Sequence, residues 1–219
     1  MSHHRQVFAN FLDALHQESV NYLLIRGFRY LPERPDTDID LVPHLNHLES
    51  FHKVARRHLV LNEQEVPVKD YGFAEYAQMT YWPYFTPGNL DESIPGGRFR
   101  VDVYSCLFFL SPYDGFSSFW TVPKAFYESV FVRKKNERGF FIPSVEDEIT
   151  LLLLRNLLDQ HGHWKEKHKI RITELLEVAS RQELIQQVAM ALPFAEKLCQ
   201  HLYVEDFDSL FNILMEKPS

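Results

Sequence analysis

The chain has 219 residues, 45% of them hydrophobic and 14% aromatic, so it can bury a core without a disulfide or a structural metal. Thirty acidic against 23 basic residues give a net charge of -7, which argues against a long nucleic acid as the main partner. A nucleoside triphosphate remains compatible, because bound metal and a few basic side chains can reverse the field inside one cleft.

The cysteines and the hydropathy pattern indicate the cellular compartment in which the protein works. Cys106 and Cys199 lie far apart and lack zinc-ligand spacing, which predicts two buried free thiols and a reducing compartment, the cytoplasm. No segment approaches the roughly 20 apolar residues of a membrane span. The amino terminus has no basic region followed by an apolar stretch, so we expect neither a membrane span nor secretion.

The first elements in chain order are a helix and a strand. Apolar residues recur at helical spacing up to about residue 18, which predicts an amphipathic helix. Residues 20–25 (VNYLLI) form a short apolar run that predicts a strand. This run ends at Arg26 and Gly27, and the glycine can turn the chain or let the backbone approach a ligand closely.

A second strand is predicted at residues 37–42 (TDIDLV), where polar and apolar residues alternate. Asp38 and Asp40 are separated by one residue, so both side chains leave the same face of that strand. Ile39 and Leu41 point to the other face. The pattern therefore predicts two carboxylates side by side above an apolar layer.

The next segments predict a helix and further strands. Residues 45–58 are helix-like, and residues 59–69 and 73–84 predict an antiparallel continuation of the sheet. After a loop rich in proline and glycine at residues 87–97, residues 98–109 (RFRVDVYSCLFF) alternate again. Asp102 lies between two valines in that stretch and supplies a third strand-borne carboxylate.

The last third of the chain predicts helices. Ser144, followed by acidic residues 146–148 and an apolar run, is a strong helix start. Helical periodicity then covers residues 165–179, 181–192 and 207–215. We therefore predict an α+β protein with a catalytic domain at residues 1–143, built on a mixed sheet with flanking helices, and a helical domain at residues 144–219.

Three carboxylates on neighbouring strands predict a metal site. Hard cations such as Mg²⁺ or Mn²⁺ accept oxygen ligands of this kind, and Asp38, Asp40 and Asp102 are sufficient to anchor a pair of them. Such a pair neutralises the attacking and leaving oxygens in phosphoryl or nucleotidyl transfer. Asp102 can also take the proton of the attacking hydroxyl if it lies within hydrogen-bond reach.

The segments YLLIRGF, DTDIDLV and RVDVY together resemble the signature of the DNA polymerase β-like nucleotidyltransferase superfamily, over residues 20–105. That signature is an apolar strand, a glycine turn, an Asp-x-Asp strand and a later strand with one carboxylate. The resemblance implies that Asp38 and Asp40 ligate metal and that Asp102 completes the site. It also implies that the Gly27 turn holds the triphosphate.

The glycine turn departs from the family pattern. The family has Gly-Ser or Gly-Gly there, whereas this chain has Gly27 followed by Phe28 and preceded by Arg26. Arg26 or Arg29 can replace the missing hydroxyl with a charged fork to a phosphate. The family also uses basic residues of its helical part to steady the triphosphate. Here Lys169 and Arg171, in the basic stretch at residues 165–171, are the candidates, and a solvated basic face is the favoured alternative.

The acceptor is indicated only by a second resemblance. LLIRGFRYLPERPDTDIDLV and the later FFIPSVEDEITLLLLRNLL are similar to a bacterial subgroup of this superfamily associated with surface polysaccharide assembly. This similarity implies a small-molecule, sugar or glycan hydroxyl as acceptor and a nucleoside triphosphate as donor. The alternatives are a catalytically degenerate protein that binds a nucleotide or a partner, and a nucleotidyltransferase that modifies a protein. The oligomeric state stays open.

A histidine cluster and an aromatic cluster each have a structural interpretation beside the functional one. His161, His163 and His168 invite a metal-site interpretation, but their spacing fixes no ligand geometry, and a solvated helix end is the favoured reading. The aromatic residues 81, 82, 84 and 85 suit either an acceptor pocket or core packing.

Overall fold

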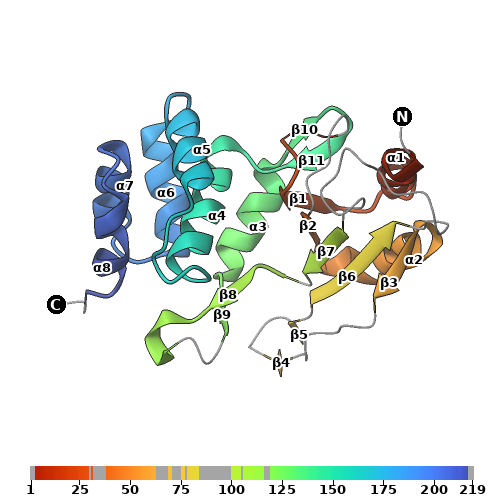
Figure 1. Ribbon diagram of the computed structural model, residues 1–219, viewed down its shortest axis with the longest axis horizontal. Helices are drawn as coiled ribbons and strands as arrows, with labels where there is room; N and C mark the ends of the chain where they lie inside the picture. Colours follow the sequence, from red (N-terminus) through yellow and green to blue (C-terminus); the bar gives the residue numbers. More distant parts are fainter. Residues whose placement is uncertain are drawn as a thin grey trace. The chain divides into compact units, whose positions relative to one another are not determined.

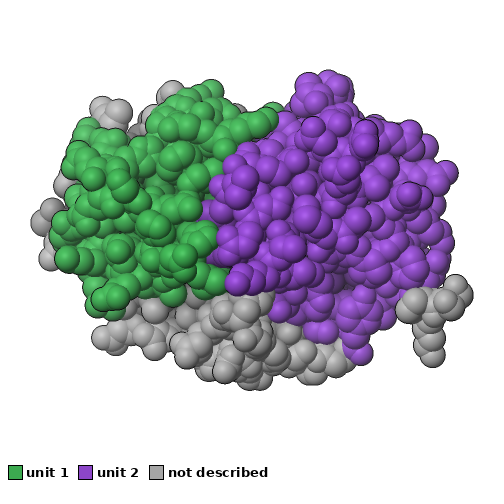
Figure 2. Space-filling model, turned by 180° about the vertical axis from the view of Figure 1, so that it is seen from behind, with its two compact units in different colours: residues 1–107, 134–142 green, residues 108–133, 143–219 purple. Residues whose placement is uncertain are grey.

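The computed structural model describes residues 3–29, 31, 38–62, 69–70, 75–76, 78–83, 100–104, 106–115 and 119–216. The chain forms two compact units, coloured separately in Figure 2. Unit 1 comprises Met1–Leu107 and Lys134–Ile142, and unit 2 comprises Phe108–Arg133 and Pro143–Ser219. The compact units do not test whether residues 1–143 and 144–219 fold as independent domains, so that division stays a prediction.

Unit 1 contains a five-stranded mixed sheet with the strand order β1-β2-β7-β6-β3 (Figure 1). Its strands are β1 (Tyr22–Arg26), β2 (Asp38–Pro43), β7 (Arg100–Tyr104), β6 (Gln78–Pro83) and β3 (Leu59–Asn62). β2 and β7 run parallel, and every other neighbouring pair is antiparallel. The sheet and its helices confirm the predicted α+β class, and the pairing of β3 with β6 confirms the predicted antiparallel continuation.

The two predicted helices are present as α1 (His3–Gln17) and α2 (Leu48–His58), and both pack against one face of this sheet. α2 follows a short 3₁₀ turn, η1 (Leu45–His47). The shared core contains apolar residues of both helices and of three strands: Phe8, Phe11, Leu15, Phe51, Val54, Leu24, Ile39, Leu41, Val101 and Val103. Because side chains alternate along a strand, the residues between these on β2 and β7 belong to the opposite face. Asp40 and Asp102 are two of them.

Short strand pairs complete unit 1. β4 (Lys69–Asp70) pairs with β5 (Glu75–Tyr76), and β10 (Lys135–Glu137) pairs with β11 (Phe140–Ile142). Lys134, just before β10, donates a hydrogen bond to the Asn21 side chain, and its Nζ lies 3.7 Å from the ring centroid of Phe141. Burial lowers the pKa of Lys134 to about 8.

The strand predicted at residues 98–109 is wrong in one respect. β7 ends at Tyr104, and β8 (Phe108–Leu110) belongs to a separate hairpin with β9 (Phe119–Thr121) in unit 2. The alternation of RFRVDVYSCLFF is nearly continuous and so gives no sign of this break. Cys106 follows β7 in the sequence, and both cysteines are buried free thiols, as predicted.

Unit 2 is mostly helical. Its helical segments are η3 (Pro112–Asp114), α3 (Lys124–Arg133), α4 (Val145–Leu157), α5 (Glu166–Leu176), α6 (Arg181–Ala191), α7 (Ala195–Tyr203), η4 (Phe207–Ser209) and α8 (Leu210–Leu214). The helices α4, α5, α6 and α8 match predicted segments, whereas α3 and α7 were not predicted. Ser144 caps α4, since its Oγ accepts a hydrogen bond from the backbone N–H of Asp147. Within the described residues, no helix is long and apolar enough to cross a membrane.

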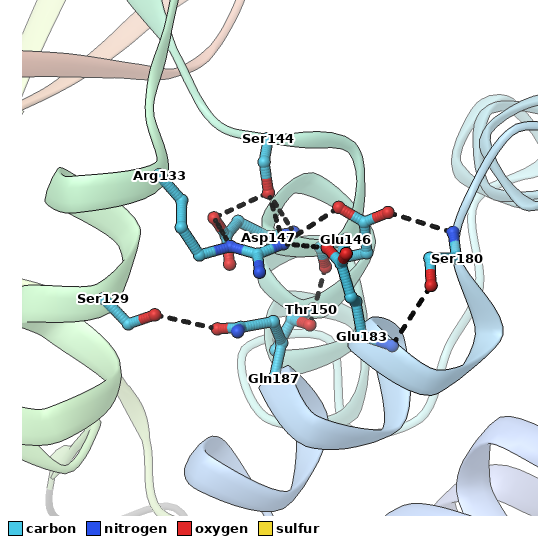
Figure 3. Close-up of polar contacts among 9 residues, drawn as sticks. All are labelled: Ser129, Arg133, Ser144, Glu146, Asp147, Thr150, Ser180, Glu183 and Gln187. Carbon is cyan, nitrogen blue, oxygen red and sulfur yellow. Dashed lines mark hydrogen bonds and ion pairs between the residues drawn. The ribbon is translucent and has the colours of Figure 1, made fainter.

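A polar network lies at the start of α4 and centres on Arg133, the last residue of α3 (Figure 3). The Nη2 of Arg133 lies 2.9 Å from Oε2 of Glu146 and 3.2 Å from Oγ of Ser144, and its Nε lies 3.3 Å from Oδ2 of Asp147. Ser144 Oγ donates to the same Asp147 oxygen at 2.7 Å. Asp147 is fully buried, and burial raises its pKa, while Ser144 and Arg133 act in the opposite direction.

This network reaches α6 as well (Figure 3). Glu146 Oε1 accepts a hydrogen bond of 3.0 Å from the backbone N–H of Ser180, the cap of α6. Glu183 Oε2 lies 3.3 Å from Arg133 Nη2, and Ser129 Oγ of α3 donates to Gln187 of α6 at 3.2 Å. One arginine therefore links the end of one helix to the first turns of two others.

Gly162, in the turn after α4, has a backbone conformation and surroundings that suit glycine alone. Its φ is +78°, and an added Cβ would lie 2.6 Å from Cβ of Phe211. We expect Gly162→Ala to lower the free energy of unfolding by about 2 kcal/mol in urea titration, from strain and overpacking together. Gly115→Ala is the control, because its φ is +71° and no described atom lies within 4 Å of an added Cβ. Gly115→Ala should lower the free energy of unfolding by only about 1 kcal/mol. If both variants lose the same stability, the Phe211 side chain moves aside at little cost.

Candidate functional site

Two buried carboxylates lie side by side on the face of the unit 1 sheet away from α1 and α2. In the parallel register of β2 and β7, Asp40 is the partner of Asp102, and Ile39 is the partner of Val101. Asp40 is 5% exposed and Asp102 is 2% exposed. An ionised carboxylate at such burial needs a counter-charge or hydrogen-bond donors. The prediction that the later strand brings Asp102 next to the Asp-x-Asp strand therefore agrees with the register.

A register shift brings Arg26 to Asp40. β1 and β2 pair Leu24 with Leu41, but the next pair is Arg26 with Asp40, which is the irregularity of a β-bulge. In a regular strand, Arg26 would share the apolar face with Leu24. The extra residue, Ile25, turns Arg26 onto the carboxylate face instead, as bulges do near functional sites. Arg26 Nε then lies 2.6 Å from Oδ2 of Asp40.

Tyr104 closes a ring of polar contacts around Asp40. Its hydroxyl donates to Oδ1 of Asp40 at 3.1 Å and accepts a hydrogen bond of 3.0 Å from Nη2 of Arg26. Each carboxylate oxygen of Asp40 is therefore contacted by a donor group, Oδ2 by Arg26 and Oδ1 by Tyr104. Burial raises the pKa of Tyr104, and the charges of Asp40 and Asp102 raise it further, against the lowering effect of Arg26. The phenol consequently stays protonated and remains a donor to Asp40.

Tyr104 is a site residue that the sequence reasoning missed. It lies two positions after Asp102 on β7, so strand alternation places the two residues on the same face. That spacing was available in RVDVY, but an aromatic residue at a strand end more often signals packing than polar contact. The geometry instead makes its hydroxyl the link between Arg26 and Asp40.

The remaining predicted residues of unit 1 are located only in part. β2 begins at Asp38, whose Cα is the register partner of Arg100, and the Asp38 side chain lies outside the described part of the structure. Gly27 follows Arg26 with φ of 75°, in the left-handed region, so its position at a turn is confirmed. Arg29 is exposed in the loop that follows. Its contact with a phosphate stays a prediction.

The donor chemistry at Asp40 and Asp102 suits a divalent cation. Carboxylate oxygens are the ligands that Mg²⁺ and Mn²⁺ prefer, and each oxygen has two lone pairs. Among the described side chains, no group of three His, Cys, Asp or Glu residues could hold a metal ion. The predicted set includes Asp38, so the three-carboxylate metal site stays a prediction.

Lys169 belongs to α5 in unit 2. Its Nζ lies 3.9 Å from Oδ1 of Asp208 and 5.7 Å from the ring centroid of Phe207. Arg171, from the same basic stretch, forms a fork with Glu148, with N–O distances of 2.7 and 2.8 Å. Arg171 is therefore a structural residue of unit 2. The role of Lys169 at a triphosphate stays a prediction.

The histidine cluster divides into exposed and buried members. His161 and His163 are exposed in the turn after α4, which agrees with the solvated helix end. His168 is buried instead, and its Nδ1 lies 2.9 Å from Oδ1 of Asn156. The solvated reading is therefore wrong for His168, which belongs to the core of unit 2. The side chains of the aromatic residues 81, 82, 84 and 85 lie outside the described part of the structure.

Comparison with known proteins adds little to this geometry. No family model matches the chain, and no curated protein matches it. Two solved structures from Helicobacter pylori are similar in part. A proposed nucleotidyltransferase shares 15% identity over 98% of this chain and 97% of its own, with a TM-score of 0.34. The protein JHP933 shares 13% identity over 96% of this chain and 91% of its own, also with a TM-score of 0.34. Likenesses this distant carry no argument about fold or function.

Proposed function

We propose that this chain is a metal-dependent nucleotidyltransferase. It moves a nucleoside monophosphate, or a related phosphoryl group, from a nucleoside triphosphate to a hydroxyl of a small-molecule, sugar or glycan acceptor. The observation that supports this proposal most is the pairing of Asp40 with Asp102 on adjacent parallel strands, both nearly fully buried. Two carboxylates held together at this burial are costly to the fold, and a cation site is a reason to keep them there.

In this proposal Asp38, Asp40 and Asp102 hold Mg²⁺ or Mn²⁺, which would neutralise charge on the phosphates and on the attacking and leaving oxygens. The acceptor oxygen forms a bond to the α-phosphorus, and the bond from that phosphorus to pyrophosphate breaks. The proton of the acceptor hydroxyl passes to the carboxylate of Asp102 or to water. Arg26, Gly27 and Arg29 bind phosphate, with Lys169 as a further candidate.

A thermal-stability screen tests the proposal. A ligand that binds only the folded protein stabilises it by about 2.7 kcal/mol at a hundred times its Kd. For a chain of 219 residues this corresponds to a rise in Tm of roughly 5–10 °C. We expect such a rise with one or more nucleoside triphosphates in the presence of Mg²⁺, and much less with Mg²⁺ or nucleotide alone. A panel in which no triphosphate raises Tm would contradict the proposal.

A catalytically degenerate binding protein is the second candidate function, and the Arg26–Asp40 ion pair favours it. An arginine at 2.6 Å already neutralises Asp40, so the carboxylate pair can persist without metal. Release of pyrophosphate from a triphosphate that stabilises the protein separates the two candidates. A degenerate protein would show the rise in Tm and no pyrophosphate. Transfer of radiolabel from the nucleotide to a protein substrate, rather than to a sugar or polyol, would instead indicate a protein-modifying enzyme.

A further inference from the structure

The guanidinium of Arg26 occupies the position of a counter-ion at the candidate metal site. Its Nε lies 2.6 Å from Oδ2 of Asp40, and its Nη2 donates to the Tyr104 hydroxyl, which donates to the other oxygen of Asp40. The Asp40 side chain is only 7% exposed. Because this carboxylate is shielded from water, its electrostatic interaction with a neighbouring charge is stronger than it would be in water.

A divalent cation and this guanidinium compete for the same carboxylate. Arginine does not lose its proton at any pH that proteins tolerate, so Arg26 cannot relieve the repulsion by becoming neutral. It has to move. The Arg26 side chain is 23% exposed, its strand is irregular at this point, and Gly27 follows it in a left-handed conformation. The guanidinium is therefore placed at the edge of the buried site, where a side chain can turn outward.

A triphosphate gives the displaced guanidinium a new partner. Guanidinium binds phosphate through two parallel hydrogen bonds, and such charge-assisted bonds are among the strongest in proteins. We propose that a cation displaces Arg26 from Asp40, and that the phosphates of the nucleotide then receive the displaced guanidinium. Arg26 thus weakens the binding of a cation alone and strengthens the binding of a cation with a triphosphate. This inference rests on the proposed function, because it assumes that Asp40 binds metal.

The experiment uses one variant and two probes. Arg26→Gln removes the charge, and Mn²⁺ binding without nucleotide is measured from the electron paramagnetic resonance signal of free Mn²⁺. We expect the variant to bind Mn²⁺ at least about tenfold more tightly than the natural protein. Inorganic triphosphate with saturating Mg²⁺ is then titrated by calorimetry. Here we expect at least about tenfold weaker binding. A merely loosened fold would weaken both, so the opposite signs are diagnostic.

Two further variants serve as controls. Arg57→Gln removes the same charge from α2, where Arg57 pairs with Glu18, and it should change neither affinity. Arg26→Lys keeps the charge but loses the fork, so its Mn²⁺ affinity should stay within about threefold of the natural protein and its triphosphate affinity should fall. This last variant carries the test if Arg26→Gln melts early by circular dichroism.

The outcomes separate two kinds of failure. The inference is overturned if Arg26→Gln binds Mn²⁺ no more tightly than the natural protein, if Arg57→Gln gives the same gain, or if triphosphate binding is unchanged. The proposed function itself fails if neither the natural protein nor Arg26→Gln binds Mn²⁺. Mn²⁺ binding by Arg26→Gln alone would instead support the inference in its strongest form.

Discussion

Replacing Asp40 or Asp102 by asparagine is expected to lower nucleotidyl transfer by at least about a hundredfold while the protein stays folded. Asparagine keeps the size and one carbonyl oxygen of aspartate, but it has no negative charge with which to hold a cation. Asp40→Asn also leaves Arg26 without its ion-pair partner. That loss is tolerable, because the Arg26 side chain is 23% exposed and water can solvate it. Pyrophosphate release measures the activity, and urea unfolding measures the stability.

Asp13→Asn is the matched control. Asp13 is an exposed residue of α1, so the same chemical change there should alter transfer by less than about twofold and stability by less than about 0.5 kcal/mol. Unchanged turnover in both Asp40→Asn and Asp102→Asn would refute the assigned metal site. A loss of turnover that follows a loss of folded protein would show only that the buried carboxylates are structural.

The carboxylate pair could be predicted from the sequence because the relevant pattern is local. TDIDLV places Ile39 and Leu41 in the core and Asp40 on the other face, and RVDVY does the same for Val101, Val103 and Asp102. The pairing of the two strands is a different matter. Nearly 60 residues separate β2 from β7, and their parallel register depends on how the intervening chain folds. The carboxylate pattern suggested that the two strands are neighbours, and the resemblance to a known signature supported this, but neither fixes the register.

The contacts of Asp40 could not be predicted because they depend on an irregularity. Strict alternation from Leu24 places Arg26 among the apolar residues, and no residue type marks a bulge at Ile25. The register shift reverses that assignment and brings Arg26 to Asp40. The sequence reasoning offered Arg26 as a phosphate ligand. It had no means of predicting that the same guanidinium holds a carboxylate.

Two helices of unit 2 were missed for identifiable reasons. α3 (Lys124–Arg133) buries Phe126, Tyr127, Val130 and Phe131, which are aromatic and β-branched residues that are enriched in strands. Its helical state depends on packing within unit 2. α7 (Ala195–Tyr203) begins after Phe194, which has a left-handed conformation and makes no side-chain cap. The usual helix-start signal is therefore absent. By contrast, Ser144 and the acidic residues that follow it are a clear helix-start signal for α4.

Loss of the Arg133 side chain should destabilise the fold strongly. Arg133→Met keeps much of the aliphatic stem but leaves Glu146 and the fully buried Asp147 without their counter-charge. Breaking a buried pair by removing one partner costs about 3–5 kcal/mol, and we expect a loss near the lower end, because the Arg133 side chain is 24% exposed. Urea unfolding near pH 7 measures it. Lys197→Met, which breaks an exposed pair with Glu216 in the same unit, should cost less than about 1 kcal/mol.

The deficit of Arg133→Met should also depend on pH, and its sign follows from Asp147. Burial raises the pKa of Asp147 in the folded protein, and Arg133 opposes that rise. Without the guanidinium the folded pKa moves still higher, while the unfolded value is unchanged. The folded variant then takes up a proton more readily than the unfolded chain as the pH falls through that pKa, so it regains stability. We expect the deficit to be smaller near pH 5 than near pH 7. A deficit that is constant between these values would mean that Arg133 stabilises the helices by packing alone.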